Sequence, residues 1–376
     1  MKILVLQENL SKALNYVNRA VSNRPNIPIL SNCLIEAEKD MLKLSATNLE
    51  IGISTWIGAD ISEVGKVTVS AKLLSEFINS LKPGKVKLGV SEQLFEVNFV
   101  DNKAEFFIIP AEDFPRVPQS EGDYLLEVGA LDFADAISKT AFASGTDESR
   151  PVLTGVLLTA KEKLLTLVGV DGFRLSKKEI KLETNVKGEE VKEIIPAKSL
   201  MEVEKLIHEV ADKKDKVQIY YLGAKNQILF KFNNIEFSSR LIEGEFPDYQ
   251  KIIPTESVLK FTVPREDLSN VIKIASIFAR NVIGNKTRFK VDAEEKLLSL
   301  SASVVDVGKN ESKVELKEIR GESLETGFNI RYLNEMITAI KSKEITFQAN
   351  GPTAPGVFLD TEDPDFIHII MPMRLD

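Results

Sequence analysis

Cysteine and histidine are scarce in this chain of 376 residues, which contains one cysteine, Cys33, and two histidines, His208 and His368. A single cysteine excludes an internal disulfide and a cysteine-based zinc site. His208 falls on a predicted helix and His368 on the last predicted strand, and an ordinary surface or sheet position explains each better than a catalytic base. We therefore expect neither a disulfide nor a bound metal.

Long apolar runs are also missing. No stretch approaches the roughly 20 apolar residues that a membrane-spanning helix needs. The first residues, Met1–Glu8, carry an early charge and no cleavable apolar core, so they do not resemble a secretory signal. The sequence thus predicts a cytoplasmic protein with no membrane partner.

Signatures of nucleotide-binding and catalytic sites are absent as well. The chain contains neither a phosphate-binding G-x-x-x-x-G-K-[ST] loop, nor G-x-G-x-x-G after a strand, nor a G-x-S-x-G elbow. Carboxylate pairs such as Glu189-Glu190 and Glu294-Glu295 fall in charged turns, where solvated surface is the ordinary interpretation. We expect no catalytic residues, no cofactor and no enzymatic activity; an enzyme with an unrecognised site is the weakest alternative.

The overall charge argues against nucleic acid at first sight. The formal net charge is −8, whereas the usual footprint of a nucleic-acid-binding domain is basic. Affinity for phosphates depends, however, on where Lys and Arg gather, so one basic face within an acidic protein would suffice.

The most informative feature is internal repetition, with one unit of about 125 residues written three times. Each copy opens with an apolar strand and a helix whose apolar residues recur at i, i+3 and i+4, and it then repeats this strand–helix pair. Aligning the second helices places Lys72, Lys198 and Arg331 at one equivalent position. The strand–helix pairs begin at Lys2, Val69, Leu125, Ile195, Leu259 and Phe328.

Between the predicted helices the chain alternates in the manner of strands, and strands outnumber helices. The pairs Phe114-Pro115 and Phe246-Pro247 close the first two copies, since proline suits a strand exit into a linker. We therefore predict an α+β protein of three tandem domains, each with two helices on antiparallel sheets. The predicted boundaries are 1–120, 125–254 and 255–376.

Several stretches resemble the bacterial DNA polymerase III beta subunit, the replication sliding clamp. They run through all three copies and end with Met371-Pro-Met-Arg-Leu near the C-terminus, which is quite specific. The matching stretches are Arg24-Pro25 with Pro28–Leu30, Ala46–Ile51, Ser149–Gly155, Val170–Ser176, Leu241–Tyr249 and Ile370–Leu375. The resemblance implies clamp-type domains, with a head-to-tail homodimer that forms a six-domain ring whose helices line the hole.

The resemblance also implies the function and the partners. Such a ring encircles double-stranded DNA, contacts its phosphates without sequence preference, and gives the replicative polymerase processivity. The implied protein partners are the DNA polymerase III catalytic subunit, a clamp-loader ATPase, and other replication and repair enzymes that bind through short linear peptides. A repeat-built protein-binding scaffold without DNA binding is the alternative.

Each of the six predicted helices carries at least one cation off its apolar stripe, and facing inward these would give a positive bore. Ordinary solvated helix faces are the alternative interpretation. The acidic Asp147 and Glu148 would repel phosphate, so we expect no DNA contact from their loop. The candidate DNA-binding residues are Arg24, Lys12, Arg19, Lys72, Lys139, Lys198, Lys205, Lys273 and Arg331.

The resemblance further implies an apolar cleft for partner peptides between the second and third domains. Methionine adapts to differing partner side chains, and Gly172 allows close backbone approach; the alternative is that the apolar positions are plain core. Phe173 and Asp376 depart from the usual pattern there. The candidate peptide-binding residues are Leu153, Val170, Gly172, Arg174, Leu175, Pro247, Lys251, Ile252, Met371, Pro372, Met373 and Arg374. Phe77, Phe106 and Ile283 match apolar positions of the dimer seam, or are simple core.

Overall fold

The computed structural model describes residues 1–22, 27–188, 190–223, 226–304 and 306–375. The chain divides into two compact units, each considered by itself below. The first consists of Met1–Ala134, Glu183–Glu189 and Glu202–Leu241, and the second of Asp135–Leu182, Glu190–Met201 and Ile242–Asp376. Arg24 and Asp376 lie outside the described residues.

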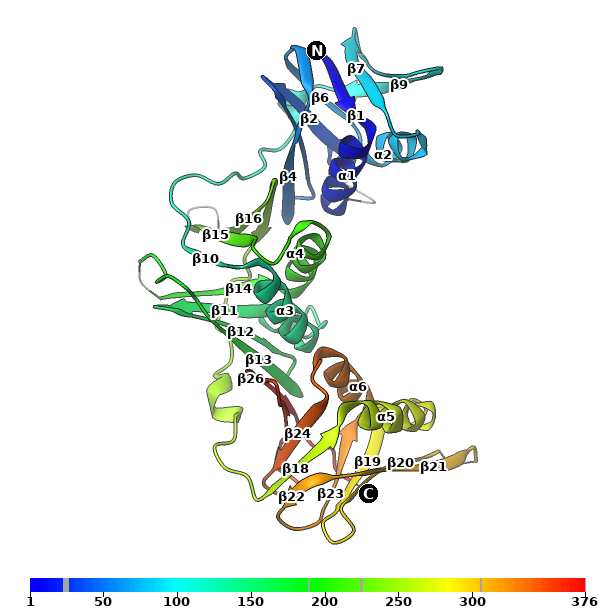
Figure 1. Cartoon of the computed structure of the whole chain (residues 1–376), viewed down its shortest axis with the longest axis vertical. Coiled ribbons are helices and arrows are strands. Elements are labelled where there is room, and N and C mark those ends of the chain that lie inside the picture. The colour runs from blue at the N-terminus through cyan, green and yellow to red at the C-terminus, as the bar shows by residue number, and fades with distance from the viewer. Residues whose placement is uncertain (23–26, 189, 224–225, 305, 376) are drawn as a thin grey trace. The chain divides into compact units, whose positions relative to one another are not determined.

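Six α-helices occur among the described residues, and each directly follows a strand, as the repeated pattern predicts (Figure 1). The helices are α1 (Gln7–Val17), α2 (Ala71–Ser80), α3 (Ala130–Thr140), α4 (Ala197–Val210), α5 (Arg265–Ala279) and α6 (Ile330–Ala339). The strands before them are β1 (Lys2–Leu6), β6 (Gly65–Ser70), β10 (Leu126–Gly129), β14 (Val191–Pro196), β18 (Leu259–Pro264) and β23 (Leu324–Asn329).

The helices form because an apolar stripe of helical period buries one face of each. In α1, Leu10, Ala13, Leu14 and Val17 are buried, while Lys12 between them is exposed. Within the described residues, no helix is long and apolar enough to cross a membrane.

The first unit is built on a sheet of thirteen strands, in the order β10-β15-β16-β17-β4-β3-β2-β6-β9-β8-β7-β1-β5. Its remaining strands are β2 (Asn32–Glu38), β3 (Met41–Thr47), β4 (Ile51–Gly58), β5 (Asp60–Glu63), β7 (Lys85–Ser91), β8 (Leu94–Phe99), β9 (Asn102–Ile109), β15 (Lys216–Leu222), β16 (Gln227–Phe232) and β17 (Ile235–Arg240). The sheet crosses from the second repeat to the first where β17 pairs with β4, from Ile235 opposite Thr55 to Ser239 opposite Ile51.

The second unit contains a nine-stranded sheet, β14-β11-β12-β13-β26-β25-β24-β18-β22, and a four-stranded sheet, β21-β20-β19-β23. The remaining strands are β11 (Gly155–Lys161), β12 (Leu164–Val170), β13 (Arg174–Lys181), β19 (Lys286–Asp292), β20 (Leu297–Val304), β21 (Gly308–Glu315), β22 (Lys317–Arg320), β24 (Glu344–Ala349), β25 (Gly356–Asp360) and β26 (Asp363–Ile370). Here β13 of the second repeat pairs with β26 of the third, from Arg174 opposite Ile370 to Lys178 opposite Phe366.

The core of the third repeat is rich in phenylalanine. Phe347 lies at the centre, with ring centroids 5.0 Å from Phe261, 5.1 Å from Phe289 and 5.1 Å from Phe358. Each of these side chains is at most 1% exposed. The apolar faces of α5 and α6 join the same buried cluster, which fixes both helices on one side of the strands.

Candidate functional site

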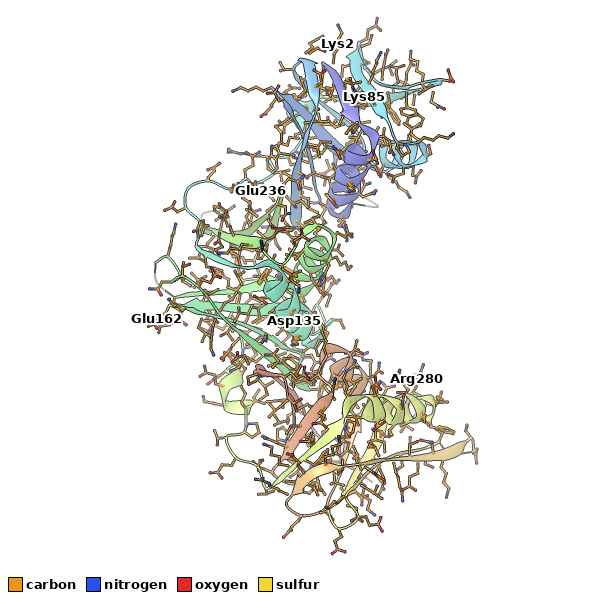
Figure 2. The ribbon with its side chains drawn as sticks, viewed as in Figure 1. Lys2, Lys85, Asp135, Glu162, Glu236 and Arg280 are labelled. Carbon is orange, nitrogen blue, oxygen red and sulfur yellow. The ribbon has the colours of Figure 1, made fainter. Side chains whose placement is uncertain are left out.

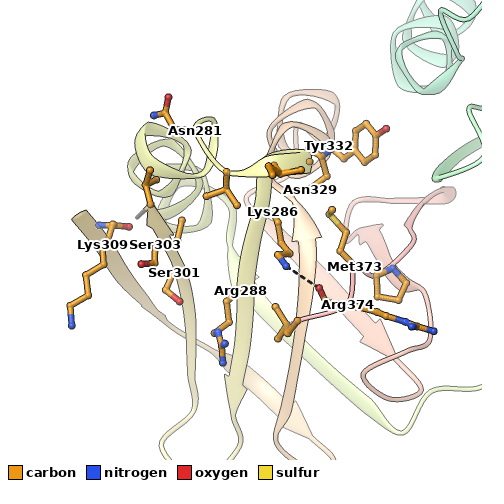
Figure 3. A pocket seen from close by; sticks show the side chains of 18 of the residues that line it. Asn281, Lys286, Arg288, Ser301, Ser303, Lys309, Asn329, Tyr332, Met373 and Arg374 are labelled. Carbon is orange, nitrogen blue, oxygen red and sulfur yellow. Dashed lines mark hydrogen bonds between the residues drawn. The ribbon is translucent and has the colours of Figure 1, made fainter. Parts of the chain in front are cut away.

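A cavity of about 1360 Å³ opens in the second unit (Figure 3). It is bounded by the turn after β12, the segment after α5, the strands β19 to β21, the start of α6 and the C-terminal tail. Its lining residues are Phe173, Asn281–Gly284, Lys286, Arg288, Ser301–Val304, Lys309–Glu311, Asn329, Tyr332 and Met371–Leu375. The predicted Met371, Pro372, Met373 and Arg374 are all among them.

Backbone hydrogen bonds hold the C-terminal tail along this cavity. The Met371 N–H donates to the Phe173 carbonyl at 2.8 Å, and the Met373 N–H donates to the Gly327 carbonyl at 2.8 Å. Lys286 Nζ donates to the Arg374 carbonyl at 3.3 Å. Because the backbone supplies these bonds, the tail side chains remain available, and Met371 is 38% exposed.

Two glycines permit this arrangement. Gly172 has a φ of +94°, a conformation that a side chain disfavours, and its turn presents Phe173 with 59% of its surface exposed. A Cβ at Gly327 would lie 2.8 Å from the Met373 carbonyl oxygen, so only glycine lets the tail approach β23 this closely. The cavity mouth therefore has an aromatic side chain on one rim and methionines on the other.

Arg174 is buried and its guanidinium is engaged within the chain, while its predicted role in peptide binding stays a prediction. Its Nε donates to Asp171 Oδ2 at 3.0 Å, its Nη2 donates to the Phe142 carbonyl at 2.6 Å, and its Nη1 donates to Glu335. The guanidinium also stacks over Tyr332, 4.4 Å from the ring centroid. Arg174 therefore supports the cavity wall by joining the turn after β12 to α6.

The other predicted peptide-binding residues lie outside the cavity lining. Val170 and Leu175 are buried in a neighbouring apolar cluster with Ile369 and Phe246. The Leu153 carbonyl accepts a hydrogen bond from the Gly145 N–H at 2.7 Å. Three predicted residues are exposed, namely Pro247, Ile252 and Lys251, which pairs with Asp248 at 2.8 Å. The predicted set thus divides into residues that line the cavity, two residues of this apolar cluster, and others that belong to neither.

Cations occupy matching places on the second helices of the three repeats. Lys72, Lys198 and Arg331 are each the second residue of their helix, α2, α4 and α6, and all three are exposed. Arg331 Nε also lies 3.4 Å from Glu335. Lys12 on α1 and Lys273 on α5 are exposed too. The predicted equivalence of these helix positions is confirmed; contact with phosphate stays a prediction.

Lys139 does not fit the expected phosphate contact. It is 4% exposed, and its Nζ lies 3.0 Å from Asp135 and 2.5 Å from Asp363. Figure 2 labels Asp135, which lies on α3. Burial lowers the pKa of Lys139, but the bonds to Asp363 and Asp135 outweigh this and raise it, so the ammonium stays charged. Lys139 is therefore a buried ion-pair residue of the second unit rather than a surface cation.

Arg19 and Lys205 are also occupied. Arg19 bonds Glu202 at 3.0 Å and Glu209, while Lys205 bonds Glu202 at 2.7 Å. Burial raises the pKa of Glu202, but Lys205 and Arg19 outweigh it and hold that pKa below its usual value. Both cations are thus partly neutralised, although Lys205 is still 58% exposed.

The predicted seam residues take different places. Phe106 is 6% exposed and meets Phe77 edge to face, with ring centroids 6.0 Å apart, so it has little surface to offer a partner. Its neighbour Phe107 is 86% exposed. Ile283, 96% exposed, lines the cavity beside the C-terminal tail instead of an edge strand.

Among the described residues, the last strand of the first repeat, β9, and the third strand of the β19-β20-β21 meander, β21, each have an open edge. β9 pairs with β8 on one side, and on the other it pairs with β6 only at Ile108 and Ile109. β21 pairs with β20 alone and forms the edge of its sheet (Figure 1).

In the part of the chain that the structure describes, no group of His, Cys, Asp or Glu side chains could hold a metal ion.

Sequence models of three domain families match consecutive parts of the chain. They are the N-terminal, central and C-terminal domains of the DNA polymerase III beta subunit, at residues 1–118, 127–248 and 250–374. The beta sliding clamp of a Synechocystis strain is 30% identical, with all of both chains covered. That of Staphylococcus aureus is 29% identical, with 100% of this chain and 99% of the relative covered. The chain belongs to the bacterial DNA polymerase III beta subunit family.

Solved structures of this family have the same fold. The Bacillus subtilis sliding clamp superimposes with a TM-score of 0.94 at 26% identity, with both chains fully covered. A Pseudomonas aeruginosa sliding clamp bound to griselimycin gives 0.93 at 26% identity, also over both whole chains. The function is that of a DNA sliding clamp for the polymerase, and the DNA-free scaffold is not favoured. Sliding clamps are non-catalytic processivity factors.

Sequence reasoning missed most residues that line the cavity beside the C-terminal tail, among them Val282, Tyr332 and Leu375. It had flagged Phe173 only as a departure and had assigned Ile283 elsewhere. An exposed apolar pair directly after a helix, Val282-Ile283, was an available signal. No sequence signal placed Tyr332, because its neighbour Arg174 is distant in sequence and meets it only in the fold.

Proposed function

We propose that two copies of this chain close head to tail into a ring around duplex DNA and tether the replicative polymerase to it. One observation carries the proposal: the chain joins its own repeats twice by the same strand pairing. Among the described residues this leaves one strand of each kind, β9 and β21, with most or all of one edge open. The three repeats are proposed as the domains 1–120, 125–254 and 255–376.

The two internal junctions follow one rule. In each junction the last strand of one repeat pairs with the third strand of a three-stranded meander in the preceding repeat. At the first junction β17 pairs with β4 of the β2-β3-β4 meander, and at the second β26 pairs with β13 of the β11-β12-β13 meander. By the same rule the last strand of the first repeat, β9, is the partner for β21, the third strand of β19-β20-β21. Within the described part of one chain β9 and β21 do not pair with each other, so by this rule β9 of one copy pairs with β21 of a second copy.

Such a contact is heterologous, since the two copies present different surfaces. A heterologous contact closes into a ring when its rotation allows, and otherwise continues as a filament. Two chains of three repeats supply the six domains of the proposed ring. Phe107, beside the buried Phe106 and the half-buried Phe77, is the exposed apolar side chain that β9 offers to this seam.

We further propose that the exposed helix cations contact DNA phosphates. The set comprises Lys12, Lys72, Lys198, Lys273 and Arg331, with Lys205 and Arg19 as weaker members because of their ion pairs. Arg24 stays in the proposal on the strength of the resemblance alone. Phosphate contacts carry no sequence information and weaken with salt, which suits a ring that slides.

The cavity beside the C-terminal tail is the proposed docking site for partner peptides. Its proposed partners are the polymerase catalytic subunit, the clamp-loader ATPase, and other replication and repair enzymes. Met371, Met373 and Phe173 would bury a partner's apolar side chains, and Arg374 is the exposed cation at its rim. We propose that the protein has no catalytic activity or cofactor of its own, and that it works in the cytoplasm, where the DNA is.

The decisive experiment compares retention on two forms of DNA. The protein is loaded onto nicked circular duplex by a loader ATPase, and half of each sample is then linearised. We expect the protein to stay on the circle through a high-salt wash and to be lost from the linear form. Equal loss from both forms would reject topological holding, and a strictly monomeric mass in solution would reject the ring.

A further inference from the structure

The cavity beside the C-terminal tail is larger than the apolar side chains of a partner peptide alone require. Its volume of about 1360 Å³ exceeds the roughly 300–1,000 Å³ of ordinary ligand pockets. One part is apolar and lies between Phe173, Ile283 and the methionines of the tail. The other part extends over the outer face of β19, β20 and β21, where the lining is polar.

The shape of the polar part follows from the strand register. Arg288 on β19 lies opposite Ser301 on β20, and Ser303 lies opposite Lys309 on β21. The middle strand therefore offers short hydroxyl side chains, with Arg288 on one side and Lys309 and Glu311 on the other, Glu311 lying opposite Ser301. Figure 3 shows Ser301 and Ser303 between Arg288 and Lys309. We call this surface, defined by Arg288, Ser301, Ser303 and Lys309, the serine trough.

Positive charge dominates the trough and its continuation along the sheet. Lys290 and Lys313 follow on the same outer face, both opposite Ser299, and both are exposed. The carboxylates on this face are already paired: Glu311 lies 3.9 Å from Lys313, and Glu325 bonds Arg288. Unlike the chain as a whole, whose net charge is −8, this surface attracts anions.

The basic part has a defined end. Beyond Ser299, the next outward positions of β19 and β21 are Asp292 and Glu315, both opposite Leu297. Glu311, opposite Ser301, is the carboxylate of the cavity lining, but cations outnumber carboxylates up to Ser299 and only carboxylates follow beyond it. An anionic segment is therefore favoured where it adjoins the apolar part. Arg374 adds an exposed cation on the other side of the cavity.

We propose that the serine trough binds an acidic flank, rich in Asp and Glu, of the same partner peptide whose apolar side chains fill the rest of the cavity. This inference rests on the proposed docking function. A peptide is favoured over nucleic acid because one continuous cavity joins the cations to exposed methionine and phenylalanine side chains. Arg288 already bonds Glu325, but its half-exposed planar guanidinium has further N–H donors, which suit a peptide carboxylate.

The test uses two fluorescent peptides with one shared leucine and phenylalanine anchor and different flanks. One flank carries Asp and Glu, and the other carries Asn and Gln at the same positions. Binding to the full-length protein is measured by anisotropy at low and high salt. We expect the acidic peptide to bind about 2- to 30-fold more tightly at low salt, as two exposed ion pairs would give, and the ratio to shrink at high salt.

Substitutions inside and outside the serine trough test whether the preference for the acidic peptide arises there. The double substitution Arg288→Glu/Lys309→Glu should abolish or invert the preference and leave the neutral peptide's affinity unchanged. Lys163→Glu/Lys260→Glu makes the same change of net charge at exposed positions outside the cavity and should keep the preference. Ser301→Glu adds a carboxylate to the floor, opposite Arg288, and should also remove the preference, while circular dichroism checks that each variant is folded.

The outcomes separate this inference from the docking proposal. If neither peptide binds the wild-type protein, the docking proposal fails and the trough fails with it. If both peptides bind equally, only the acidic flank is refuted. If a short duplex DNA displaces the acidic peptide but not the neutral one, the trough is a nucleic-acid surface, and the assignment to a peptide is overturned.

Discussion

Replacing Arg174 by alanine should destabilise the second unit, because this side chain joins three parts of it. The guanidinium bonds the Asp171 carboxylate, Glu335 on α6 and the Phe142 carbonyl, and Arg174 is 5% exposed. After truncation, Asp171, itself 9% exposed, would keep its charge without a cation. Breaking a buried pair on one side costs about 3–5 kcal/mol, so we expect a loss of this size.

The assay is urea unfolding of the full-length protein, followed as a shift of the transition midpoint at unchanged slope. Arg374→Ala is the matched control, since Arg374 is exposed, and a surface change of this kind stays within about 0.5 kcal/mol. A loss below about 1 kcal/mol for Arg174→Ala would refute the structural role. If the peptide affinity fell while stability did not, Arg174 would act as the direct peptide contact that the sequence first suggested.

Three further predictions follow from buried groups. Burial lowers the pKa of His368 to about 3, so an unfolded chain binds an extra proton between pH 6.5 and that value; stability should fall as the pH drops from 6.5 to 5, with a slope of about 0.7 kcal/mol per pH unit at pH 6.5 that approaches about 1.4 kcal/mol per pH unit at pH 5, and the fall should be smaller in His368→Phe. Burial raises the pKa of the Cys33 thiol to about 12, so a thiol reagent at pH 8 should react only after unfolding; rapid reaction of the native protein would contradict this. Lys139→Met should lower stability by about 1–3 kcal/mol and leave the low-salt affinity for duplex DNA unchanged, whereas Lys72→Glu should weaken that affinity and leave stability unchanged; weaker DNA binding by stably folded Lys139→Met would restore Lys139 to the DNA surface.

The repeated strand–helix units could be predicted because their signals are local. The helical recurrence of Leu10, Leu14 and Val17, and strand alternation elsewhere, report which face each element buries. The equivalence of Lys72, Lys198 and Arg331 followed from the same alignment, and all three begin their helices in the same way.

The environment of individual cations could not be predicted, because their partners are distant in sequence. Lys139 bonds Asp363, 224 residues away, and Arg174 bonds Glu335, 161 residues away. A lysine near the end of an amphipathic helix looks the same in the sequence whether solvent or a carboxylate covers it. The β17–β4 and β13–β26 junctions were missed for the same reason, since pairing across repeats has no local signature.

The open edges of β9 and β21 have a consequence for handling the subunit alone. An unsatisfied row of N–H and C=O groups accepts any extended segment, so a lone subunit is a template for misassociation and aggregation. The charged side chains that alternate along β21, Lys309, Glu311, Lys313 and Glu315, oppose haphazard addition, whereas the apolar Phe107 on β9 invites it. In the proposed ring, seam mutations that separate the copies should therefore reduce solubility as well as DNA retention.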